Sequence, residues 1–90
     1  HPQLLGFQIL FAEDDRLIAS SIREELVKEG AKVWIAHDGE EAIEVFKSNR
    51  DQINLVILDV KMPKKSGLIV MKKIKEVNAE LRMILVSGHE

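Results

Sequence analysis

The chain has 90 residues, a formal net charge of −2 and no cysteine. That length predicts a single domain over residues 1–90, and the lack of cysteine excludes disulfides, zinc–thiolate sites and thiol catalysis. No apolar run approaches the roughly 18 residues of a membrane span, and the bases of the second half alternate with apolar residues as on a solvated helix face, so we expect neither membrane insertion nor direct nucleic-acid binding.

The first two predicted elements are a strand and a helix. Residues 7–12, FQILFA, form a short apolar run that is typical of a buried strand. Residues 16–29 change to a helical period, and Gly30 stands where a C-terminal cap is needed. The residues expected on the inward face of this helix are Ile18, Ile22 and Leu26.

A second strand and a second helix follow. Residues 32–36, KVWIA, predict the strand. Asp38 offers an N-cap for the helix, with Glu41 three residues later as in a variant of the capping box. The inward residues of this helix are expected to be Ala42, Ile43 and Phe46.

The last part of the chain repeats the pattern. Residues 54–58, NLVIL, predict a third strand, and residues 82–86, RMILV, predict a fourth. Between them a loop at 63–67 leads to a helix that Ser66 can cap. Its inward residues are expected to be Val70, Met71, Ile74 and Val77.

Strands that alternate with helices of this length predict an α/β fold. The crossover connections are expected to be right-handed, and the strands to form a parallel sheet with helices on both faces. Strands one, three and four are apolar almost throughout, as strands with neighbours on both sides should be.

Acidic side chains collect where these strands end. Ligands of an open parallel sheet bind beyond the carboxyl ends of its strands, and there the sequence places Glu13, Asp14 and Asp15, then Asp59, then Ser87. Carboxylates that crowd together are costly unless a cation lies among them, and oxygen ligands favour Mg²⁺ before Ca²⁺.

Each of these residues also has an ordinary structural interpretation. For Asp15 we favour a helix cap over a metal ligand, because acids after a strand often cap the next helix. Asp59 has no helix start to cap, which favours the metal interpretation for it and Asp14. For Ser87 a turn residue and a site residue are equally well supported.

These motifs together resemble the receiver domain of two-component response regulators (CheY-like). The resemblance rests on Glu13-Asp14-Asp15, on Leu58-Asp59-Val60-Lys61-Met62-Pro63 with Gly67 four residues past the proline, and on Ser87-Gly88. It covers the chain from Gln8 onward. It implies a three-layer flavodoxin-like fold with sheet order 2-1-3-4, truncated after the fourth strand so that the fifth strand is absent.

The resemblance also implies roles for individual residues. Asp59 resembles the aspartate that accepts a phosphoryl group from a histidine kinase or a phosphotransfer protein. Asp14 matches the acid that binds Mg²⁺ directly, and Glu13 the acid that usually acts through water. Lys61 would lend its backbone carbonyl to the metal.

Three residues after the fourth strand complete the set. Ser87 matches the hydroxyl that senses the phosphoryl group, while Gly88 and His89 would lie near that group. The resemblance further implies a cytoplasmic protein with an output domain in the parent chain or in a partner. The exposed fourth strand would allow a dimer.

Two other functions stay open. A Mg²⁺-dependent phosphohydrolase also uses an aspartate nucleophile at a strand end, but it needs a second acid two residues later, where this chain has Lys61. A non-signalling scaffold or pseudo-receiver would share the fold. We expect no enzyme, but a phosphoacceptor with at most slow self-phosphorylation and self-dephosphorylation.

Overall fold

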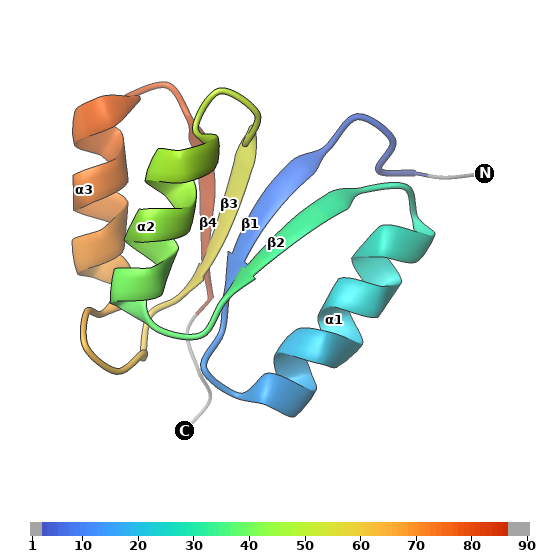
Figure 1. Cartoon of the computed structure of the whole chain (residues 1–90), viewed down its shortest axis with the longest axis horizontal. Coiled ribbons are helices and arrows are strands. Elements are labelled where there is room, and N and C mark those ends of the chain that lie inside the picture. The colour runs from blue at the N-terminus through green and yellow to red at the C-terminus, as the bar shows by residue number, and fades with distance from the viewer. Residues whose placement is uncertain (1–2, 87–90) are drawn as a thin grey trace.

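Strands and helices alternate strictly along the chain (Figure 1). The computed structural model describes residues 3–86, and all the structural observations below concern this part of the chain. Its elements are β1 (Gln8–Ala12), α1 (Arg16–Lys28), β2 (Lys32–Ala36), α2 (Gly39–Asn49), β3 (Leu55–Asp59), α3 (Gly67–Val77) and β4 (Arg82–Val86).

The strands form one parallel sheet in the order β2-β1-β3-β4. Figure 1 shows α2 and α3 on one face of this sheet and α1 on the other. The three-layer α/β fold and the sheet order that the resemblance implied are therefore confirmed. The order places β1 and β3 side by side at the centre of the sheet, and their carboxyl ends point to the same edge.

Alternate residues of β1 supply two separate cores. Leu10 and Ala12 pack into the core under α2 and α3, whereas Ile9 and Phe11 pack with Ala19 of α1 on the other face. This follows from strand geometry, because successive side chains point to opposite faces of a sheet. All four of these residues are buried, so β1 is packed on both faces where the loop that follows it begins.

The predicted helix caps are confirmed. Asp15 accepts hydrogen bonds from the backbone N–H groups of Leu17 (3.0 Å) and Ile18 (3.1 Å) at the start of α1. Asp38 and Ser66 cap α2 and α3 in the same way. Gly30 follows α1 with a φ of +102°, a conformation that favours glycine.

The second half of the capping box differs from the expected pattern. Glu41 does not bond back to the cap residue itself. Its Oε1 accepts from the N–H of His37, one residue earlier, at 2.7 Å. The α2 start is therefore tied to the end of β2 as well as to its own cap.

The inward face predicted for α1 is only partly right. Leu26 packs into the core with the buried Ala19, but Ile18 and Ile22 are 43% and 40% exposed. Within residues 3–86, α1 is the single helix on its face of the sheet. It covers β1, but no second helix from this part of the chain packs beside it, so side chains on its flank and on β4 stay exposed to solvent. On the face of the sheet that α1 covers, Ile9 of β1 is 1% exposed, whereas Ile84 of β4 is 48% exposed.

Smaller differences concern the bounds of elements and one side chain. β1 starts one residue later than the predicted 7–12, and α1 ends one residue earlier than the predicted 16–29. β3 spans Leu55–Asp59, one residue later at each end than the predicted 54–58. Val77 was expected to face inward with Val70 and Ile74, but it is 45% exposed and lines a shallow groove between α2 and α3.

The described helices are too short or too polar to cross a bilayer. The longest, α1, has 13 residues and carries charged side chains along its length.

Candidate functional site

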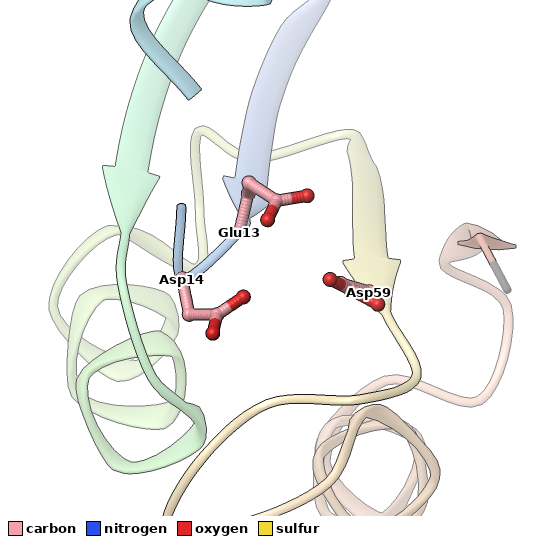
Figure 2. Close-up of side chains that lie close together, drawn as sticks. All are labelled: Glu13, Asp14 and Asp59. Atoms are coloured by element: carbon pink, nitrogen blue, oxygen red, sulfur yellow. The ribbon is translucent and has the colours of Figure 1, made fainter. Parts of the chain in front are cut away.

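Three carboxylates meet at the carboxyl ends of β1 and β3 (Figure 2). Glu13 and Asp14 directly follow β1, and Asp59 is the last residue of β3. The parallel register pairs Ala12 with Leu58, so the next residues of the two strands, Glu13 and Asp59, are neighbours. One oxygen atom from each of the three carboxylates lies within 4.8 Å of the others.

The three acids differ in their exposure to solvent. Asp14 is exposed, Glu13 is half-buried, and Asp59 is only 9% exposed. Figure 2 shows all three carboxylates turned toward one common space. The group at the bottom of this space is thus a buried carboxylate, and the group at its rim can be reached from solvent.

Backbone amides orient two of these carboxylates. The N–H of Lys61 donates to Asp59 Oδ1 at 3.0 Å, and the N–H of Asp15 donates to Glu13 Oε2 at 3.0 Å. Within residues 3–86, neither carboxylate has a lysine or arginine partner. Backbone N–H dipoles therefore stabilise the negative charge of these two carboxylates, and no lysine or arginine of the described residues neutralises it.

The surroundings of Glu13 shift its pKa. Burial raises the pKa of the Glu13 carboxyl above its ordinary value of 4.5, and the negative charges of Asp59 and Asp14 raise it further. The hydrogen bond from the Asp15 amide works in the opposite direction. A cation in the common space would remove this repulsion.

Two glycines allow the loop after Asp59 to pack closely. A Cβ at Gly67 would collide with the backbone oxygen of Asp59, and a Cβ at Gly39 would collide with the backbone oxygen of Lys65. The Gly39 N–H donates to the carbonyl of Pro63 at 3.4 Å. The loop that carries Lys61 therefore packs against the start of α2 through Gly39 and against the end of β3 through Gly67.

The other predicted site residues have separate outcomes. Asp15 lies next to the cluster but caps α1, as favoured above. The amide of Lys61 contacts Asp59, whereas the metal-binding role of its carbonyl stays a prediction. Ser87, Gly88 and His89 lie outside the described residues.

His37 is a neighbour of the site that the sequence did not single out. Its ring Nδ1 lies 3.1 Å from the backbone oxygen of Glu13. A carbonyl oxygen can only accept, so Nδ1 carries the proton of this hydrogen bond. The parallel pairing of Ala12 with Ala36 places residues 13 and 37 side by side, and this register was the signal that could have revealed the contact.

Comparison with known proteins agrees with this geometry. Residues 9–90 match the family model of the response regulator receiver domain. The chain is 41% identical over 84 residues to the transcriptional regulatory protein CpxR of Escherichia coli (strain K12). The aligned region covers 92% of this chain and 35% of CpxR. The chain thus spans about a third of the length of that relative.

Solved structures of the same class superpose closely. A response regulator receiver domain protein from Clostridium thermocellum has a TM-score of 0.88 at 32% identity, covering 92% of this chain and 66% of that one. Response regulator TrrA from Thermotoga maritima, solved in complex with Mg²⁺ and BeF, has a TM-score of 0.85 at 36% identity, covering 93% and 71%.

A crystal structure of histidine kinase ThkA in complex with TrrA also matches, with a TM-score of 0.84 and 36% identity over 93% of this chain and 71% of that one. The family match extends over nearly the whole chain, and the carboxylate cluster stands at the carboxyl edge of the sheet. This chain belongs to the response regulator receiver domain family.

Proposed function

We propose that this chain is the phospho-accepting receiver module of a two-component phosphorelay, and that Asp59 takes the phosphoryl group. The observation that supports this most directly is the position of Asp59. It is the most buried of three convergent carboxylates, and an amide of its own loop holds its orientation. A nucleophile needs such a fixed position to attack in line.

The cluster also fits a magnesium ion. Its side-chain donors are all carboxylate oxygens, the hard ligands that Mg²⁺ prefers, and one or two carboxylates with water suffice for this ion. We propose that Asp14 and Asp59 bind the ion directly, that Glu13 acts through water, and that the Lys61 carbonyl adds a further ligand. When bound, the ion supplies positive charge that neutralises the carboxylates and the incoming phosphoryl group.

The transfer itself needs only a positioned nucleophile. An oxygen of the Asp59 carboxylate attacks phosphorus, and the bond between phosphorus and the donor nitrogen of a phosphohistidine breaks. The electron pair of that bond returns to the donor imidazole. The donor leaves as neutral imidazole when its other ring nitrogen carries a proton and otherwise takes up a proton from solvent, and the product is an acyl phosphate on Asp59.

Residues after β4 complete the proposal. Asp59 is paired with Val86 in the sheet, and the N–H of Val60 donates to the oxygen of Val86 at 2.9 Å. Ser87 follows Val86 in the sequence. We propose that its hydroxyl donates to the phosphoryl group, and that Gly88 and His89 flank that group.

The partners follow from the family. ThkA, the kinase in the matched complex, is a histidine kinase, and CpxR is a transcriptional regulatory protein. By analogy, we propose a histidine kinase or a phosphotransfer protein as the donor. We also propose an output domain in the parent chain or a partner, and a cytoplasmic location, with no membrane or nucleic acid contacted by this domain.

Intact-mass spectrometry tests the proposed acceptor. The protein is incubated with acetyl phosphate, with and without Mg²⁺, and with the matched variants Asp59→Asn and Asp51→Asn. We expect one phosphoryl adduct on the wild type and on Asp51→Asn, dependent on Mg²⁺, and none on Asp59→Asn. An equal adduct on Asp59→Asn would show that another residue is the acceptor.

The same samples separate an acceptor from a phosphohydrolase. A phosphohydrolase would release many equivalents of inorganic phosphate per protein, whereas a receiver releases phosphate only as slowly as its own acyl phosphate hydrolyses. Asp59 is followed two residues later by Lys61 and not by an acid, which supports the receiver. Rapid multiple turnover would contradict it.

A further inference from the structure

An open pocket bordered by two arginines lies on the other side of β1 from Asp59. It is a cavity of about 280 Å³ between α1 and the carboxyl half of β2, which run side by side in Figure 1. The pocket is lined by Arg16, Ala19, Ser20, Arg23, Ile35 and His37. The three polar residues that α1 contributes, Arg16, Ser20 and Arg23, do not belong to the carboxylate cluster.

Three side chains of α1 give this pocket its chemistry. Arg16, Ser20 and Arg23 are spaced by four and three residues, so they lie on one face of the helix. Two guanidinium groups and a hydroxyl are donors that suit a tetrahedral oxyanion. Only four bases occur among residues 1–45, against ten acids, and two of those four line this one pocket.

The two arginines have no internal use in the described part of the chain. Among residues 3–86, no carboxylate oxygen lies within 4.0 Å of either guanidinium group. Lys28 of the same helix, by contrast, is paired with Glu25 at 3.6 Å. The guanidinium donors of the pocket are therefore free to bind a ligand from solution.

The opposite wall is fixed in place. Ile35 belongs to β2, and the hydrogen bond from the His37 ring to the Glu13 carbonyl holds that ring against the loop after β1. Ala19, at the base of the pocket, is 1% exposed. Arg16 and Arg23 thus border a pocket whose other side is formed by the buried Ala19 and by the His37 ring that the Glu13 carbonyl holds.

We infer that this pocket binds a phosphate group, either as inorganic phosphate or as the phosphate of a small monoester. The inference does not rest on the phosphoacceptor role of Asp59, since the pocket contains no residue of that site.

Phosphate titration followed by ¹⁵N NMR tests the inference on the protein in chelator, without divalent cations and at constant ionic strength. Under these conditions the carboxylate cluster repels phosphate, so any binding belongs elsewhere. We expect saturable shifts of the amides of residues 16–23 and 35–37, with a Kd on the order of 1 mM, as a few exposed charge-assisted hydrogen bonds allow.

Matched variants decide whether the pocket is responsible. Arg23→Gln should weaken binding about tenfold or more and Ser20→Ala about threefold, because each removes one donor. Lys28→Gln removes the same charge from the same helix outside the pocket and should change binding less than twofold. All three side chains are exposed, so the variants should fold. Methyl phosphate in place of phosphate shows whether a monoester is accepted.

Three results would overturn the inference. The shifts could grow linearly without saturation, Arg23→Gln could bind like the wild type, or Lys28→Gln could lose as much affinity as Arg23→Gln. The last result would mean that phosphate responds only to the net charge of the helix.

Discussion

At the scale of single residues, the crowded carboxylates should lower the stability of the metal-free protein. Glu13, Asp14 and Asp59 share one space without a lysine or arginine partner among the described residues. Sites arranged for function often reduce the stability of the fold that carries them. Repulsion within this cluster should therefore lower the free energy of unfolding, and variants that remove one charge should show this.

Removing one charge should stabilise the metal-free protein. In chelator, Asp14→Asn and Asp59→Asn should each raise the free energy of unfolding by about 1 kcal/mol, because one repulsive partner is gone. Mg²⁺ should stabilise the wild type by mass action and both variants much less. Urea denaturation measures both effects, and Asp51→Asn serves as the control. A lower stability of Asp59→Asn in chelator would contradict this account.

Glu13 should make stability depend on pH in a definite direction. Its pKa is raised in the folded state by burial and by Asp59 and Asp14, so the folded protein binds this proton more tightly than the unfolded chain does. As the pH rises above the unfolded value of about 4.5, the unfolded state loses the proton first and the folded state is disfavoured. The penalty is complete above the folded pKa.

Glu13→Gln should remove this penalty. In chelator at neutral pH the variant should be more stable than the wild type, and the difference should shrink as the pH falls through 4.5. Its side-chain oxygen can still accept from the Asp15 amide. Denaturation curves between pH 3 and pH 8 measure the difference. A difference that stays constant with pH would show that the Glu13 charge is not responsible.

At the scale of elements, the start of α1 lies directly beside the site. Asp14 belongs to the carboxylate cluster, and the next residue, Asp15, closes the first turn of the helix. Two adjacent aspartates thus have different tasks because their side chains point to different groups.

Asp15→Ala should separate these tasks. It should cost about 1 kcal/mol of stability, the usual cost of losing an N-cap, and change the affinity for Mg²⁺ far less than Asp14→Ala does. Asp15→Asn should restore most of the stability, since asparagine also caps helices. Thermal unfolding and Mg²⁺ titration measure the two quantities. A loss of Mg²⁺ affinity as large as that of Asp14→Ala would make Asp15 a ligand.

At the scale of the whole molecule, the described part of the sheet ends at an exposed strand. Within residues 3–86, β4 is an edge strand, and Ile84, Leu85 and Val86 are 48%, 37% and 44% exposed. An edge strand presents unpaired N–H and C=O groups, and apolar side chains beside it favour association with another chain.

Residues 1–90 expressed alone should therefore self-associate through β4. Sedimentation velocity at increasing concentration should show dimers or larger species, and Ile84→Lys should reduce them, because a charge on an edge strand opposes pairing. Val27→Lys makes the same kind of change at an exposed position of α1 and should have little effect. A wild type that stays monomeric at high concentration would refute the prediction.

The local features of this fold could be predicted from the sequence because they depend on near neighbours. Hydrophobic period distinguishes the strands from the helices, and Asp15, Asp38 and Ser66 are recognisable as caps within three residues of the amides they bind. The acids at the ends of β1 and β3 could be assigned to one edge because parallel strands end on the same side.

Long-range contacts required the tertiary structure. The exposure of Ile18 and Ile22 depends on which helices share the face of the sheet with α1, and no period within α1 contains that information. The contact of His37 with Glu13 depends on the register between β1 and β2. Arg16, Ser20 and Arg23 look like an ordinary solvated helix face in the sequence, and they line a pocket only because α1 packs beside Ile35 and His37 of another segment.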